Sequence, residues 1–127
     1  MWITVDASDR RPIYEQVADE IKTLIARGEL AEGHALPPVR QVAADLGVNL
    51  NTIATAYRAL QDEGLITIRH GSGAVVTAHR TTATGPKELR RSLGAVLTQM
   101  VLAGMGRAEI MATVADELKG LQKGGKR

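Results

Sequence analysis

Two short helical patterns meet at Gly47, and this junction constrains the fold more than any other feature of the chain. Apolar residues recur at helical spacing over residues 39–46, which predicts a helix with one apolar face. Gly47 suits the end of that helix, because a residue without Cβ adopts a left-handed backbone at little cost. Asn49 is then placed to cap a second helix. Polar residues occupy the first turns of this second helix, a pattern typical of helix–turn–helix proteins that read the major groove.

The segments on either side of the junction complete a recognisable order of elements. Residues 12–28 carry a strong helical pattern that opens on a proline and ends on a glycine, and residues 29–38 are predicted to form a loop. The second helix of the motif is predicted over residues 51–63. Residues 65–69 and 73–77 are predicted to form two short strands of a hairpin. The predicted fold class is therefore mainly α with a small β-hairpin, a winged helix–turn–helix.

The chain after this unit has a different organisation. We predict a winged helix–turn–helix domain over residues 1–78, a linker over 79–86 rich in Thr, Arg, Ala, Gly and Pro, and a C-terminal helical region over 87–122. Residues 123–127 form a basic tail. A further short strand is predicted over residues 2–5.

The C-terminal region contains two amphipathic patterns separated at residues 104–106. Two short helices cannot bury all their apolar surface alone, so we expect them to pair with a second copy; the alternative is that they fold back on their own winged domain. The residues expected to mediate dimerisation are Leu89, Leu93, Val96, Leu97, Met100, Val101, Ile110, Val114 and Leu118.

Composition excludes several classes of protein but does not by itself identify a partner. The formal net charge is +2, yet residues 1–80 carry eight Lys and Arg against ten Asp and Glu. The basic excess lies in residues 81–127, so a DNA-binding surface would depend on the placement of a few cations. The absence of cysteine excludes a disulfide framework. No apolar run spans a membrane and residues 1–6 do not resemble a signal peptide, so we expect a cytoplasmic location.

No constellation of residues predicts catalysis, a cofactor or a metal. His34, His70 and His79 are far apart in sequence and have no cysteine near them, which is unlike metal-ligand spacing. The stretch Gly71–Gly73 joins two predicted strands and is too short for a phosphate-binding loop, which would precede a helix. We therefore expect that the protein is not an enzyme.

The helix–turn–helix supplies the strongest candidates for contacts with DNA. Arg40 lies on its first helix, which crosses the phosphate backbone in such motifs; the alternative is a surface ion pair with Asp45. Asn49, Asn51 and Thr52 open the second helix and have side chains that suit base edges or phosphates. The alternative for the asparagines is helix capping, which is compatible with a contact to DNA.

Further candidates lie beyond the first turn of that helix and in the wing. Thr55 and Arg58 continue its polar side, where Arg58 is either a phosphate contact or a solvated side chain. Arg69, His70 and Gly71 occupy the predicted tip of the hairpin, and a wing tip commonly lies against the minor groove. The alternative is a plain hairpin with exposed polar residues.

Several motifs, in order and at family spacing over residues 10–77, resemble the GntR family of bacterial transcription regulators. The motifs that carry the resemblance are Pro12–Val17, Leu36–Arg40, Leu46–Thr52, Ala56–Ile66 and Gly71–Gly73. The short C-terminal region is similar to that of the YtrA subfamily, whose members use two helices there to dimerise. The resemblance implies a homodimeric regulator, a repressor on a pseudo-palindromic operator, and points to a neighbouring transporter operon.

The resemblance also implies roles for individual residues. It assigns a phosphate contact to Arg40, base or backbone contacts to Asn49, Asn51 and Thr52, and a wing contact to His70 and Gly71. Leu50 and Ala54 depart from the family pattern, since many members have an arginine that reads guanine at the position of Leu50. No residue pattern identifies a small-molecule effector. A competing function is that of a winged-helix module for protein–protein interaction, which the slightly acidic balance of residues 1–80 permits.

Overall fold

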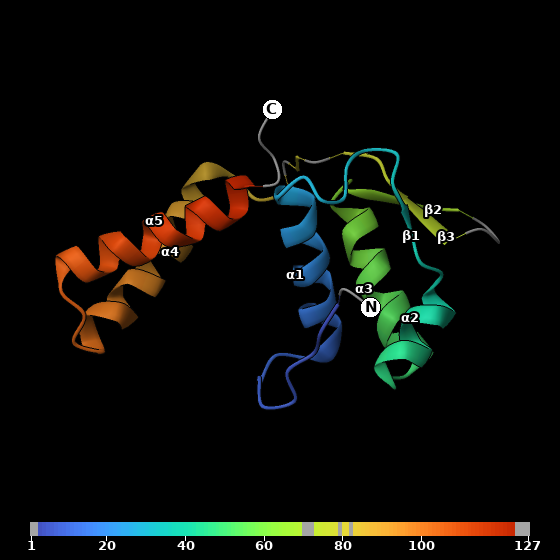
Figure 1. Ribbon diagram of the computed structural model, residues 1–127, viewed down its shortest axis with the longest axis horizontal. Coiled ribbons are helices and arrows are strands. Elements are labelled where there is room, and N and C mark those ends of the chain that lie inside the picture. Colours follow the sequence, from blue (N-terminus) through green and yellow to red (C-terminus); the bar gives the residue numbers. More distant parts are fainter. Residues whose placement is uncertain (1–2, 70–72, 79, 82, 124–127) are drawn as a thin grey trace.

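The computed structural model describes residues 3–69, 73–78, 80–81 and 83–123, and Figure 1 shows their arrangement. The elements in chain order are α1 (Ile13–Ala26), β1 (Ala35–Leu36), α2 (Val39–Leu46), α3 (Leu50–Asp62), β2 (Ile66–Arg69), β3 (Gly73–Val76), α4 (Pro86–Leu102) and α5 (Arg107–Lys123). The elements from α1 to β3 form one compact body, the winged unit. Helices α4 and α5, the C-terminal helix pair, project to one side of it.

The winged unit is built around α3, which packs against α1, α2 and β2. Its periodic apolar positions Ile53, Tyr57 and Leu60 are fully buried, as are Ile21 of α1 and Val42 of α2. The sheet closes the core from another side with Leu36, Ile66, Ala74 and Val76. Three amphipathic helices and one face of a small sheet therefore enclose a single apolar core, as the sequence pattern predicts.

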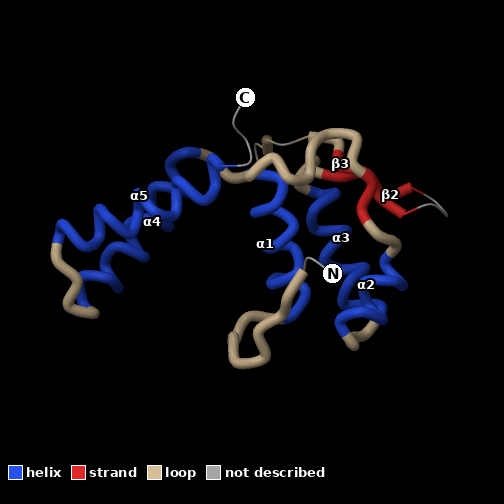
Figure 2. Tube along the Cα trace, viewed as in Figure 1, coloured by secondary structure: helices blue, strands red, loops and turns tan. Residues whose placement is uncertain are grey.

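The sheet contains one strand more than the predicted hairpin. It is antiparallel in the order β1-β3-β2, with Ile66 paired to Val76 and Leu36 paired to Ala74; Figure 2 shows its strands beside α3. The expectation of a loop over residues 29–38 was therefore wrong for Ala35 and Leu36, and the other residues of that range do form a loop. A strand of two residues that ends before two prolines has no alternation from which to predict it, and it forms because β3 offers it an open edge.

Gly73 at the start of β3 has a backbone conformation that favours glycine. Its φ of +82° is unfavourable for residues with a side chain, and a Cβ there would lie 3.4 Å from the backbone oxygen of Leu36. Glycine therefore suits this position because of its backbone conformation, and the added Cβ would only reach ordinary contact with β1.

Two smaller expectations also differ from the structure. The predicted strand over residues 2–5 was wrong for its described part, because residues 3–5 are not in a strand. Ile3 is nevertheless 1% exposed and belongs to the core. Its side chain is buried although its backbone is not part of a strand. The helix of residues 12–28 begins at Ile13, with Pro12 as its N-cap, and Ile13 is exposed instead of buried.

The C-terminal helix pair lacks a core of its own. Pro86 occupies the first turn of α4, and the Glu88 carboxylate accepts a hydrogen bond from the Gly85 backbone N–H at 3.4 Å. No residue of α4 is buried, and the leucines at 89 and 93 are more than half exposed. Helix α5 touches α1, which is its described contact with the winged unit. The predicted two helices are therefore present, and much of their apolar surface is exposed to solvent.

Across the described residues, no helix is both long and apolar enough to cross a lipid bilayer.

Candidate nucleic-acid interface

The turn between α2 and α3 has the geometry that its sequence predicts. Gly47 ends α2 in the left-handed conformation with φ of +69°, and its backbone N–H donates to carbonyl oxygens of the last turn of α2. Asn49 then caps α3, since its side-chain oxygen accepts a hydrogen bond from the Asn51 backbone N–H at 2.7 Å. This cap satisfies one of the helix's unpaired donors and fixes where α3 begins.

The N-terminal turn of α3 faces solvent. Asn49, Leu50 and Asn51 are exposed, and Thr52 is half-buried. The helix is anchored behind this turn by Ile53, which is fully buried. A rigid helix therefore presents a polar end, with one exposed leucine in it, from which side chains can reach into a groove.

The next turn of α3 is linked by hydrogen bonds within the helix. The Thr55 hydroxyl donates to the Asn51 backbone oxygen at 2.8 Å and accepts from the Arg58 guanidinium at 3.3 Å. The hydroxyl proton of Thr55 is thus already used, which leaves its methyl group for an external contact. Arg58 is exposed, and its link to Thr55 holds its stem along the helix.

Arg40 lies on the second residue of α2 and is exposed. Among the described residues it forms no ion pair, so the alternative of a pair with Asp45 is not seen. The helix places this cation on the same motif as the open end of α3. Such a side chain is available to a phosphate group.

The structure describes both strands of the wing, β2 and β3. Arg69 ends β2, is exposed and pairs in register with Gly73 of β3. The predicted contact residues His70 and Gly71 lie outside the described residues. The Ile68 backbone N–H donates to the Gln61 side-chain oxygen at 2.8 Å, so α3 and the wing strand are held together by a side chain that the sequence analysis did not single out.

Tyr57 lies in the predicted buried stripe of α3, but the hydrogen bond of its hydroxyl was not predicted. The hydroxyl donates a hydrogen bond to the Pro37 backbone oxygen at 2.6 Å, which ties the middle of α3 to the segment that leads into α2. Burial raises the pKa of Tyr57 to about 12. A signal for this link was available, because a tyrosine in a fully buried stripe needs a partner for its hydroxyl.

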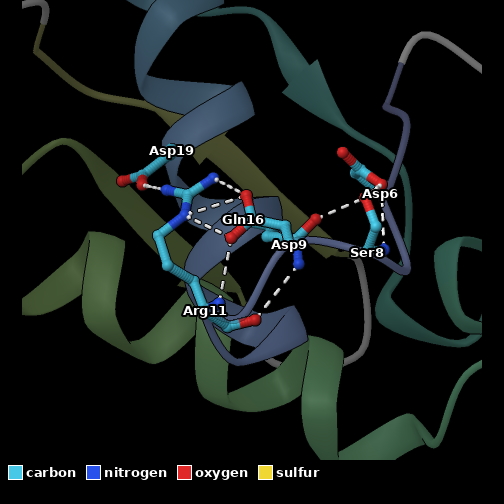
Figure 3. Close-up of polar contacts among 6 residues, drawn as sticks. All are labelled: Asp6, Ser8, Asp9, Arg11, Gln16 and Asp19. Atoms are coloured by element: carbon cyan, nitrogen blue, oxygen red, sulfur yellow. Dashed lines mark hydrogen bonds and ion pairs between the residues drawn. The ribbon is translucent and has the colours of Figure 1, made fainter. Parts of the chain in front are cut away.

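The segment before α1 is held by a polar cluster (Figure 3). The buried side chain of Gln16 accepts from the Asp6 backbone N–H at 2.9 Å and donates to the Arg11 backbone oxygen at 3.1 Å. The Arg11 guanidinium pairs with Asp9 at 2.9 Å and also with Asp19. Its hydrogen bonds lower the pKa of the Asp9 carboxyl. These contacts hold the segment before α1 against that helix.

No group of three or more His, Cys, Asp and Glu side chains in the described part of the chain is arranged to hold a metal ion. The polar residues at the open end of α3 are asparagines and threonines, which lack a titrating group suited to acid–base catalysis. The arrangement is therefore suited to recognition by hydrogen bonds and shape.

The residues expected at a dimer interface lie on the C-terminal helix pair and remain accessible. Leu89, Leu93, Val96, Val101 and Leu118 are about half exposed or more, and the other four are half-buried. An apolar groove of about 470 Å³ lies between the two helices. The residues that line it are Leu93, Leu97, Val101, Met105, Arg107, Ile110, Met111 and Val114.

Three helices and a wing, with a capped helix end open to solvent, define a winged helix–turn–helix of the class found in DNA-binding regulators. The family model described as "Bacterial regulatory proteins, gntR family" matches residues 13–76. The chain belongs to the gntR family, which confirms the resemblance inferred from its motifs.

Two curated relatives from Bacillus subtilis are similar to the chain. The transcriptional repressor YtrA is 35% identical over 80 residues, which cover 63% of this chain and 62% of YtrA. The chain thus matches a little under two thirds of that repressor's length. The HTH-type transcriptional regulator YhcF is 33% identical over 103 residues, which cover 80% of this chain and 85% of YhcF.

Solved structures share the fold of the chain to different extents. A structure from Listeria monocytogenes, described as a transcriptional antiterminator, has a TM-score of 0.80 at 28% identity and covers 93% of this chain and 90% of its own. YtrA from Sulfolobus acidocaldarius, a GntR-family transcription factor, has a TM-score of 0.63 at 38% identity. The match covers 77% of this chain and 99% of the YtrA chain. The AraR(DBD) structure, solved in complex with operator DNA, has a TM-score of 0.51 at 27% identity. The match covers 58% of this chain and 90% of the AraR(DBD) chain.

Proposed function

We propose that this protein is a sequence-specific DNA-binding transcription regulator that acts in the cytoplasm as a homodimeric repressor on a pseudo-palindromic operator. The observation that carries the proposal is the open end of α3, where Asn49 caps the helix while Leu50 and Asn51 face solvent. Membership of the gntR family supports a regulatory role. The operator-bound structure of AraR(DBD) supports DNA as the partner.

The contacts divide into those that position the protein and those that read bases. Arg40 binds a phosphate from α2, and its charge is available because no described residue pairs with it. Asn51 and Thr52 read base edges from the first turn of α3, since an asparagine amide pairs bidentately with adenine. Arg69 enters or flanks the minor groove with His70 and Gly71, where the negative potential favours cations.

The unburied surface of the C-terminal helix pair supports dimerisation. No residue of α4 is buried and the groove beside it is lined almost entirely by apolar side chains, so a second copy of the same pair is the occupant that we propose. A two-fold dimer places two α3 helices at half-sites about 34 Å apart, one turn of DNA. Light scattering should give the mass of a dimer, and a monomer at micromolar concentration would contradict this part of the proposal.

The regulatory direction and the target genes are the most specific parts of the proposal. The relative YtrA is named a repressor, which supports repression here. The likeness of the short C-terminal region to the YtrA subfamily supports control of a neighbouring transporter operon. Loss of the gene should then raise expression of that operon, whereas reduced expression would indicate an activator.

A selection of bound sequences from random DNA tests the central claim. We expect a motif with two-fold symmetry and a fixed half-site spacing. With about six to ten phosphate contacts per dimer, affinity should fall by about 10³ to 10⁵ between 50 and 200 mM salt. A winged-helix module for protein–protein interaction would instead yield neither a motif nor a steep salt dependence.

Two substitutions separate the proposed roles. Arg40→Ala should weaken binding to selected and random DNA alike, because a phosphate contact carries no sequence information. Asn51→Ala should weaken binding chiefly at particular bases. Arg90→Ala removes the same charge from the exposed surface of α4 and serves as the control for Arg40. An equal loss on selected and random DNA for Asn51→Ala would refute its reading role.

A further inference from the structure

Leu50 is an exposed apolar residue at a position where the fold gives it no structural task. It is the first residue of α3, is 45% exposed and does not belong to the core cluster. The residues on either side of it, Asn49 and Asn51, are polar and exposed. An exposed leucine in a turn that is otherwise polar leaves apolar surface in water at the end of the helix.

We infer that Leu50 makes the protein specific for thymine, by packing against the C5-methyl group of a thymine in the major groove. The inference rests on the proposed function, because it requires α3 to lie in that groove. Among the base edges in the major groove, only thymine carries a methyl group. Leucine has no donor or acceptor, so a polar base edge opposite it would lose water without gaining a hydrogen bond.

The neighbours of Leu50 strengthen this assignment. Ala54 lies four residues further along, on the same side of the helix, and its side chain is small, apolar and half-buried. The Asn49 side-chain oxygen is occupied by the Asn51 backbone N–H, whereas no described hydrogen bond occupies the Asn51 side chain. Leu50 and Ala54 are apolar and lie beside the Asn51 amide. This arrangement suits a base step in which a thymine, contacted by Leu50, is next to an adenine, contacted by Asn51.

The test uses the full-length protein and an operator selected from random DNA. Each thymine of a half-site is replaced in turn by uracil, which removes only the C5-methyl group, and affinity is measured by fluorescence anisotropy. At one thymine per half-site the wild-type protein should lose about fourfold in affinity, the equivalent of exposing one methyl group. Leu50→Ala should bind the thymine and uracil operators equally.

Two further variants make the result specific to this position. Leu102→Ala changes a leucine that is 81% exposed on α4, and it should keep the wild-type ratio of thymine to uracil affinity even if it alters dimerisation. Leu50→Arg should shift the preferred base from thymine to guanine, because arginine pairs bidentately with guanine.

The outcomes separate this inference from the proposed function. If the wild-type protein binds its selected operator but tolerates uracil at every position, the Leu50 contact is overturned and the proposed function stands. The same holds if Leu50→Ala keeps the wild-type preference for thymine over uracil. If selection returns no motif, both are overturned.

Discussion

The winged unit and the C-terminal helix pair both contain amphipathic helices, yet the winged unit buries its apolar side chains and the helix pair leaves most of them exposed. In the winged unit α3 buries Ile53, Tyr57 and Leu60 completely, against two other helices and a sheet. In α4 no residue is buried, and Val96 and Leu93 are more than half exposed. The same pattern of sequence therefore produces a closed core in one region and an open surface in the other.

The difference assigns folding stability to the winged unit and association between chains to the C-terminal helix pair. A closed core supports folding within one chain, since the burial of apolar area is complete there. An open amphipathic surface gains the same free energy only when another surface covers it. We therefore expect changes in the winged unit to act on unfolding of the monomer, and changes in the helix pair to act on association.

Removal of the helix pair should give the largest effect. A chain truncated after Ala78 retains the described core, whose residues lie between Ile3 and Val76, and should unfold cooperatively as a monomer. Its affinity for the operator should fall by about 10² to 10⁴, because a dimer binds its second half-site at a high effective concentration. Anisotropy with operator DNA and sedimentation measure these two effects. An unfolded fragment would contradict the independence of the winged unit.

A pair of matched leucine substitutions should separate the two regions next. Leu60→Ala removes a side chain that is fully buried and should cost about 2–5 kcal/mol of the free energy of unfolding. Leu93→Ala removes one that is 52% exposed and should instead raise the dissociation constant of the dimer. Denaturant unfolding at several protein concentrations distinguishes them. A Leu93→Ala loss that does not depend on concentration would place that residue in a core within the chain.

The sequence predicted most of the winged unit because its apolar periodicity and its turn residues agree. Gly47 and Asn49 perform the roles that their chemistry predicts. Strand β1 was missed, since two residues before Pro37 carry no period and the strand depends on the edge of β3. Gln16 was missed as well, because its two hydrogen bonds join segments whose approach depends on the tertiary fold.

The hydroxyl of Tyr57 provides a test within the winged unit at high pH. Its pKa is raised to about 12 in the folded state, against about 10 in an unfolded chain. The unfolded state therefore loses the proton first, and stability that is complete below pH 10 should decline as the pH rises toward 12. The loss is of order 2 kcal/mol. Urea unfolding from pH 9 to 12 measures it, and Tyr57→Phe should remove this dependence.

At neutral pH the same substitution has a smaller effect. Tyr57→Phe leaves the Pro37 carbonyl oxygen without its 2.6 Å hydrogen bond and should cost about 1 kcal/mol. Because this bond joins α3 to the segment before α2, operator affinity should also fall. A variant with unchanged affinity and reduced stability would show that the bond serves folding alone.

The smallest effects concern helix caps, and they compare the two regions directly. The Asn49 side-chain oxygen caps α3 by accepting a hydrogen bond from the Asn51 backbone N–H at 2.7 Å. Asn49→Ala should therefore cost about 1 kcal/mol in the free energy of unfolding. The Glu88 carboxylate accepts a hydrogen bond from the Gly85 backbone N–H at 3.4 Å, on a helix without buried residues. Glu88→Ala should therefore change the stability of the winged unit by less than about 0.5 kcal/mol. Thermal unfolding of both variants provides the measurement. Equal losses would mean that α4 and α3 unfold as one unit, and the two regions would then share a single cooperative core.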